Sequence, residues 1–286
     1  MKIVRFSAVG GPVRLGLLGR DMISPLDDIL PAADDDARNL IAGWEEFGPL
    51  ATAAQESSTA QLRLNDVQLH APVARPGKIF AIGLNYADHI LESKIGTPEH
   101  QIWFTKAVTS IAGPYAEVEV PSLPSAVDYE AELVVVIGKG GRELSREDAP
   151  GAVFGYCVGN DVTERQWQHR TPQWSLGKSF DTHAPVGPWI TTADNVRDPH
   201  GLDIKTWVNG ELRQSSNTTH LVFDIWDQIS HLSHAMTLEP GDLIFTGTPG
   251  GVGAAMNPRQ FLQEGDVVRV EIDGLGSIEN RLVLRK

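Results

Sequence analysis

The chain has 286 residues, a length that fits one large domain or a large domain with a smaller one. Its formal net charge of −13 argues against nucleic acid and anionic membranes as partners, because both require a basic surface. One cysteine excludes an intrachain disulfide, and no apolar stretch has the length of a membrane span or a secretory signal. We therefore expect a cytoplasmic globular protein with no nucleic-acid or membrane partner.

Residues 1–75 are expected to form a small leading domain. The runs "KIVRFS" and "VRLGLLG" predict a short hairpin at its start. Asp34 to Asp36 can cap a helix whose apolar residues recur at helical spacing, namely Leu40, Ile41, Trp44 and Phe47. Residues 71–83, "APVARPGKIFAIG", contain two prolines and two glycines, and they predict a linker into a larger domain at 76–286.

Short β-rich runs dominate after residue 76, among them "KIFAIG", "ELVVVIG", "DIKTWVNG", "DLIFTG" and "VVRVEIDG". Asn209-Gly210 predicts a type I′ hairpin, and Asp273-Gly274 offers a second turn. Helical patterns are few, and they cover about 86–94, 146–152, 163–170 and 221–235. Because strands and helices do not alternate regularly, we expect a β-rich α+β fold with a folded-over, largely antiparallel sheet.

Three carboxylates stand at the ends of predicted strands. In "VDYEAELVVVI", residues i and i+2 of a strand share a face, so Glu130 and Glu132 point the same way. Asp161 follows the apolar run "GYCVGN". Without nearby histidine or cysteine ligands, this set suits Mg²⁺ or Mn²⁺, and Ca²⁺ is also compatible. The alternative is that these are solvated acids at strand ends.

Two further segments carry titratable side chains. In "GLNYADHILES", Asn85 can cap a helix that places His89 and Glu92 on one face at i, i+3, where a carboxylate can orient an imidazole for activating water. Lys178, in "SLGKSFDTHAPVGPWI", can balance nearby carboxylates or hold an anionic substrate. The alternatives are an exposed helical pair and an ordinary surface lysine.

The loop at 245–253, "FTGTPGGVG", lacks the lysine of a phosphate-binding loop, so nucleotide binding is not expected. Its backbone N–H groups, including that of Gly247, and the hydroxyls of Thr246 and Thr248 can hold a carboxylate. The alternative is a wide turn between strands. The sequence also lacks a G-x-S-x-G nucleophile motif, and Cys157 lies in an apolar run that is typical of a core residue.

Six separated segments occur in an order typical of one family: "IGLNYADHILES", "DYEAELVVVIGKGGR", "GYCVGNDVTERQWQ", "LGKSFDTHAPVGPWI", "VNGELRQ" and "GDLIFTGTPGGVG". They resemble the motif series of the fumarylacetoacetate hydrolase superfamily across essentially all of residues 76–286. The resemblance implies a β-roll within an α+β fold, a small N-terminal domain and a homodimer. It also implies that Glu130, Glu132 and Asp161 hold Mg²⁺ or Mn²⁺.

The same resemblance implies roles for other side chains. His89 and Glu92 match a pair that activates water, in a segment that often orders as a lid over substrate. Lys178 matches a lysine beside the metal. Two further sets are implied to bind substrate: the Gly-rich loop residues Gly247 and Thr248, and the pair Arg165 and Gln168.

We therefore expect a metal-dependent hydrolase that cleaves the C3–C4 bond of acylpyruvates or related 2,4-diketo acids. Its products would be pyruvate, or a substituted pyruvate, and a carboxylic acid, as in bacterial catabolism of sugar acids or aromatic compounds. Its expected partner is a small anionic 2-oxo acid. The alternatives are oxaloacetate decarboxylation, isomerisation or decarboxylation of 2-oxo-enoic acids, ureidoglycolate cleavage, and binding of 2-oxo acids without catalysis.

Overall fold

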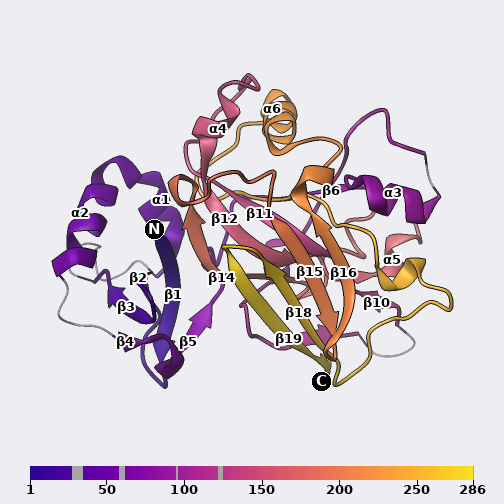
Figure 1. Ribbon diagram of the computed structural model, residues 1–286, viewed down its shortest axis with the longest axis horizontal. Coiled ribbons are helices and arrows are strands. Elements are labelled where there is room, and N and C mark those ends of the chain that lie inside the picture. Colours follow the sequence, from indigo (N-terminus) through magenta and orange to yellow (C-terminus); the bar gives the residue numbers. More distant parts are fainter. Residues whose placement is uncertain (28–34, 58–61, 95, 122–124, 286) are drawn as a thin grey trace.

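Strands outweigh helices in this protein, with 37% of the residues in strands and 22% in helices. The computed structural model describes residues 1–27, 35–57, 62–94, 96–121 and 125–285 (Figure 1). The β-rich α+β class predicted from the sequence is confirmed. None of the helices within these residues is long and apolar enough to cross a membrane.

The predicted N-terminal hairpin is present. β1 (Lys2–Ala8) pairs antiparallel with β2 (Arg14–Leu18), and β2 continues to β3 (Met22–Pro25). β4 (Leu62–Arg63) pairs with β3, and β5 (Val67–His70) pairs with β1. These strands lie at the left of Figure 1, in indigo and purple, next to the helices of the same colours.

The single helix predicted after Asp36 is instead two helices, α1 (Ala37–Ala42) and α2 (Trp44–Ser57). Asp36 caps α1 as expected, since its side chain accepts the N–H of Arg38, whereas Asp34 lies outside the described residues. Gly43 ends α1, and the ring of Phe47 packs so closely that a Cβ on Gly43 would lie 2.5 Å from it. The close packing of Phe47 therefore requires a glycine at the break.

One sheet of twelve described strands runs through the molecule. Its path is β4-β3-β2-β1-β14-β12-β11-β17-β6-β7, with β5 and β8 (Ile111–Ala112) pairing to the side. The strands after β5 on this path are β6 (Ile79–Gly83), β7 (Ile102–Thr105), β11 (Ala131–Ile137), β12 (Val153–Asn160), β14 (Ala184–Thr192) and β17 (Leu243–Phe245). Because β1 pairs with β14, the sheet crosses the predicted domain boundary at residues 75–76.

A second sheet covers one face of the first. Its order is β16 (Glu211–Asn217), β15 (Asp203–Val208), β18 (Val267–Ile272), β19 (Gly276–Leu284) and β9 (Val118–Val120). Figure 1 shows its orange and yellow strands in front of β11, β12 and β14. Asn209 and Gly210 have φ values of 52° and 82°, so the predicted type I′ hairpin is confirmed.

The strand β11 lies between two hydrophobic clusters. Leu133, Val135 and Ile137 face the cluster that contains the second sheet, whereas Val134 and Val136 face the cluster that contains α1. Because both faces of β11 are covered, the strand is apolar along most of its length. Its carboxylates are therefore confined to its beginning, where the strand meets the cavity described below.

Four helices follow the predicted ranges: α3 (Ala87–Ser93), α4 (Ala149–Ala152), α5 (Arg165–Gln168) and α6 (Ile225–Ala235). The prediction that Asn85 caps α3 is wrong, because Tyr86 occupies the cap position. The side chain of Asn85 instead donates to the carbonyl oxygens of Phe223 and Thr246 and accepts the N–H of Phe223. Asn85 therefore connects three distant segments.

Short elements complete the described chain. The strands β10 (Val127–Asp128) and β13 (Thr163–Glu164) pair with each other. Single 3₁₀ turns lie at Leu64–Asp66, Val108–Ser110, Ala193–Asn195, Thr218–His220 and Gly253–Ala255. The pairing of β10 with β13 brings α5, which directly follows β13, close to the beginning of β11.

Candidate metal centre and active-site cavity

The three predicted metal carboxylates lie together. β11 and β12 are antiparallel with Ala131 opposite Asn160, so the start of one strand is beside the end of the other. Glu130 and Asp161 flank this pair, and the Asp161 N–H donates to the carbonyl oxygen of Glu130 at 2.8 Å. One carboxylate oxygen from each of Glu130, Glu132 and Asp161 lies within 4.8 Å of the others, and all three residues are buried.

Two of these carboxylates already have cationic partners. The Lys178 Nζ lies 2.7 Å from Glu130 and 2.6 Å from Asp161, and Arg165 lies 2.7 Å from Glu130. Burial acts to raise the pKa of Glu130, but Lys178 and Arg165 outweigh it and hold the pKa at about 2. Glu130 is therefore ionised at neutral pH.

Glu132 differs from its two neighbours, because within the described residues no lysine or arginine forms an ion pair with it. Burial, Asp161 and Glu130 together raise the pKa of Glu132 well above its ordinary value. A cation bound among the three carboxylates would remove this unfavourable charge. Three buried oxygen donors therefore fit a hard divalent ion.

Lys106 is a buried lysine of this centre that sequence reasoning missed. Its Nζ donates to Asp161 Oδ1 at 2.5 Å and to the carbonyl oxygen of Lys178. Burial lowers the pKa of Lys106, and the attraction of Asp161 opposes that effect. Lys106 therefore orients Asp161 and balances its charge. The sequence feature that could have identified Lys106 is its position as a single lysine within the apolar run "IWFTKAV".

The predicted His–Glu pair is formed on α3. His89 Nδ1 lies 2.7 Å from Glu92 Oε1, and the other Glu92 oxygen accepts the N–H of Gly251 at 2.8 Å. Asp88 holds the same loop, because it accepts the N–H of Gly250 at 3.3 Å. With Nδ1–H donated to Glu92, the Nε2 atom of His89 is left to accept a proton.

Arg165 and Gln168 belong to one hydrogen-bonded unit on α5. Arg165 donates to Gln168 Oε1 at 3.0 Å and through two nitrogens to Asp128, at 2.8 and 2.9 Å. Asp128 also accepts the N–H groups of Gly253 and Ala254. Sequence reasoning missed Asp128, although it extends the i, i+2 alternation of the two strand-end glutamates.

Some polar groups of the Gly-rich loop form hydrogen bonds within the protein, and one can donate into the cavity. The Thr246 hydroxyl donates to the carbonyl oxygen of Leu133, so its predicted role in holding a carboxylate is wrong. The Gly247 N–H donates to Glu132 at 2.7 Å, and the predicted contact of Gly247 with substrate stays a prediction. The Thr248 oxygen accepts from Gln214 at 2.9 Å, which leaves its hydroxyl hydrogen free to donate.

A cavity of about 560 Å³ brings the predicted residues together. Its wall includes His89, Glu92, Glu130, Arg165, Gln168, Lys178 and Thr248, which come from five separate parts of the chain. Phe104, Trp174 and Phe261 add apolar surface to the same wall. The cavity thus combines a buried acidic centre, a base and several hydrogen-bond donors.

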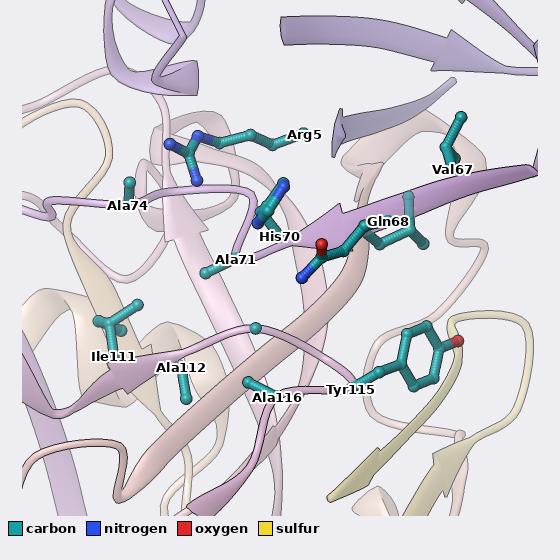
Figure 2. Close-up of a pocket in the computed structure, with 12 residues that line it drawn as sticks. Arg5, Val67, Gln68, His70, Ala71, Ala74, Ile111, Ala112, Tyr115 and Ala116 are labelled. Carbon is teal, nitrogen blue, oxygen red and sulfur yellow. The ribbon is translucent and has the colours of Figure 1, made fainter. Parts of the chain in front are cut away.

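A second hollow, of about 410 Å³, lies between β5 and residues 111–116, and Figure 2 shows Arg5 and His70 on one side of it. Its two basic side chains already have partners within the protein. Arg5 pairs with Asp35 at 2.9 Å, and His70 Nε2 lies 2.9 Å from the Ser7 hydroxyl. The predicted catalytic residues all lie elsewhere, so we place the chemistry in the larger cavity.

Residues 78–283 match the family described as fumarylacetoacetate (FAA) hydrolase, C-terminal. The chain belongs to the fumarylacetoacetate hydrolase family. The resemblance inferred from the six sequence segments is therefore confirmed.

Similar proteins include two curated sequence relatives and one enzyme of known structure. The chain is 42% identical over 288 residues to a mitochondrial oxaloacetate tautomerase of Xenopus laevis, covering 99% of this chain and 90% of that protein. It is 46% identical over 237 residues to a human mitochondrial oxaloacetate tautomerase, covering 81% of this chain and 76% of that protein. Maleylpyruvate hydrolase from Sphingobium sp. SYK-6, solved with manganese(II) and pyruvate, is 37% identical with a TM-score of 0.86 over 100% of both chains.

Proposed function

We propose that this family member is a divalent-metal-dependent hydrolase that cleaves the C3–C4 bond of acylpyruvates. The observation that carries the proposal is the His89–Glu92 pair, 2.7 Å apart, on the wall of the cavity that Glu130 also lines. A base beside an acidic metal centre is the arrangement that activation of water requires. Mg²⁺ and Mn²⁺ are the proposed ions, and the oxygen donors are also compatible with Ca²⁺.

Glu130, Glu132 and Asp161 would hold the ion, which when bound would supply positive charge to the carboxylate and keto oxygens of a 2-oxo acid. The Thr248 hydroxyl would donate to the substrate carboxylate, because its oxygen is already fixed by Gln214. Arg165 and Gln168 line the same cavity and would orient the substrate from α5. These contacts would align the reacting carbonyl with His89.

His89 would take a proton from water at Nε2, and Glu92 would stabilise the resulting imidazolium. The hydroxide formed adds to C4, the C3–C4 bond breaks, and its electron pair goes to the pyruvate fragment. C3 then accepts a proton, so the products are pyruvate and a carboxylic acid. Lys178 would stabilise the negative charge that develops near it. A positioned base contributes about 10²–10⁴ in rate.

The test is pyruvate release from a panel of acylpyruvates in the presence of Mg²⁺ or Mn²⁺. We expect turnover by the wild-type protein and a loss of about 10²–10⁴ in kcat for His89→Asn, with unchanged metal affinity. No turnover of any acylpyruvate, together with activity on oxaloacetate, would reject the proposal.

Oxaloacetate tautomerisation is the second candidate, because the two curated relatives described above carry that name. It needs a base that moves a proton between C3 and the enol oxygen, and His89 can supply this without a water nucleophile. The keto and enol forms differ in ultraviolet absorbance. Their accelerated interconversion without release of pyruvate would favour this candidate over both hydrolysis and oxaloacetate decarboxylation.

We also propose that the protein is a cytoplasmic homodimer that takes a small anionic 2-oxo acid. The resemblance of the motif series supports the dimer, and the cationic side chains of the cavity support an anionic substrate. The curated relatives above carry names that place them in mitochondria, so cell fractionation is the appropriate test of location. Light scattering coupled to size-exclusion chromatography tests the dimer.

A further inference from the structure

One arginine at the cavity has no acidic partner among the residues that the structure describes. Arg165 and Lys178 pair with Asp128, Glu130 and Asp161, so their charges are already balanced. Arg259 lines the same cavity, but its guanidinium forms no hydrogen bond or ion pair with any residue that the structure describes. Its side chain is exposed, whereas Glu130 is 5% exposed. Arg259 therefore lies at the mouth of the cavity and the metal centre at its buried end.

The guanidinium of Arg259 gives the mouth of the cavity a positive charge. His169 lines the cavity too, and burial followed by the charges of Arg165 and Arg259 lowers its pKa. The whole chain has a formal net charge of −13, so an arginine without an acidic partner among the described residues is a local exception to its acidic character. Such a site attracts an anionic group.

Aromatic side chains form another part of the cavity wall. Trp174 and Phe104 pack with their ring centroids 5.8 Å apart. Gly83 allows this position of Trp174, because a Cβ at residue 83 would lie 2.3 Å from the indole ring. Phe261 contributes a third aromatic ring to the lining. A substrate that fits this cavity therefore combines an oxygen-rich end, a carbon chain and an anionic outer end.

We propose that the cavity takes a dicarboxylic 2-oxo acid whose second carboxylate is bound by Arg259 at the mouth. This inference rests on the proposed function, which places the 2-oxo acid group of the substrate at the metal centre. A planar guanidinium can donate two parallel hydrogen bonds to a carboxylate, which a flexible lysine cannot reproduce. Arg259 is therefore a specificity-determining residue that favours diacids over monoacids of equal length.

The test compares succinylpyruvate with butyrylpyruvate, which has a methyl group in place of the terminal carboxylate. In Arg259→Gln, we expect kcat/KM for succinylpyruvate to fall about 10- to 100-fold, mainly through KM, because a charged hydrogen bond is lost. The value for butyrylpyruvate should change less than about twofold, and Arg259→Lys should be intermediate. Equal losses for both substrates, or no loss for either, would overturn the proposal.

Two variants control for charge alone. Arg170→Gln removes the same charge from an arginine whose guanidinium lies over the ring of Trp167, 4.2 Å from its centroid, and which does not line the cavity. Lys94→Gln removes the other lining cation that has no acidic partner among the described residues. Neither control should change the preference for succinylpyruvate, and a shift as large as that of Arg259→Gln in either one would contradict the assignment to Arg259.

A binding measurement separates this inference from the proposed function. Calorimetry with 2-oxoadipate and 2-oxohexanoate, in the presence of Mn²⁺, reports the preference for a diacid without turnover. If no acylpyruvate is hydrolysed but the wild-type preference for 2-oxoadipate is lost in Arg259→Gln, the hydrolase proposal fails and the carboxylate site stands. If acylpyruvates are hydrolysed but the wild type and Arg259→Gln show the same relative affinity for the two acids, the proposed carboxylate site is wrong and the hydrolase proposal stands.

Discussion

Glu132 is the residue on which the metal proposal depends most directly. It accepts the N–H of Gly247 and has no cationic side chain paired with it within the described part of the chain. Glu132→Gln keeps the shape of the side chain but removes one anionic ligand. We therefore expect Mn²⁺ affinity to fall by at least about tenfold, with a parallel loss of activity. Calorimetry measures the affinity directly.

The matched control is Glu147→Gln, which changes an exposed glutamate that does not line the cavity. It should leave both metal affinity and activity unchanged. Unchanged activity of Glu132→Gln at limiting Mg²⁺ would refute this assignment of the strand-end glutamates.

His183 should make the folding stability depend on pH. It is fully buried with Nε2 at 2.8 Å from the carbonyl oxygen of Glu119, and burial lowers its pKa to about 4. The unfolded chain then binds more protons than the folded one below about pH 6.5, so stability falls as the pH decreases. Urea unfolding should show a loss of about 2 kcal/mol from this residue between pH 7.5 and 5.

His183→Asn isolates this contribution, because asparagine does not titrate and can still donate to Glu119. The variant should be less stable at pH 7.5 but should lose less stability on acidification. Equal slopes for variant and wild type would show that His183 does not titrate in this range.

At the scale of elements, the Gly-rich loop holds α3 in place. Gly251 donates its N–H to Glu92 and has a φ of +103°, and a Cβ there would lie 2.1 Å from the Arg213 carbonyl oxygen. Gly251→Ala should therefore cost about 1–3 kcal/mol in stability from backbone strain. It should also lower kcat at least about tenfold, because Glu92 and His89 lose their support.

Gly250→Ala is the neighbouring control. A Cβ at this position would meet its nearest atom, in Asp88, at 3.4 Å, an ordinary contact distance. Thermal unfolding and kcat should therefore change little. Similar effects of the two substitutions would mean that the loop yields more easily than its contacts indicate.

At the scale of the whole molecule, the N-terminal strands and the cavity-bearing strands share one sheet. β1 pairs with β14, and Leu40 belongs to the same hydrophobic cluster as Val134 and Phe245. Removing residues 1–75 would uncover an edge of β14 and part of this core. We expect the fragment 76–286 to aggregate, and the full chain to unfold in one transition by both circular dichroism and fluorescence.

A soluble and active fragment 76–286 would contradict this expectation, as would two separate transitions in the full chain. Either result would show that residues 1–75 form an independent domain. The predicted division of the chain is thereby open to a direct measurement.

The sequence by itself determined the features that depend on short-range periodicity. Alternation along a strand placed Glu130 and Glu132 on one face, helical spacing paired His89 with Glu92, and Asn209-Gly210 specified a turn. These arrangements follow from backbone geometry within a few residues, so no distant contact is needed to establish them. The order of the six motif segments then identified the family.

Only the tertiary structure decided which distant residues complete the site. Lys106, Asp128 and Gln214 act through partners between 34 and 125 residues away, such as Asp161, Gly253 and Thr248. Arg259 became informative only when Arg165, Lys178 and Lys106 were seen to be paired with carboxylates. The physical reason is that burial and charge compensation are properties of packed segments, and no local pattern in the chain specifies them.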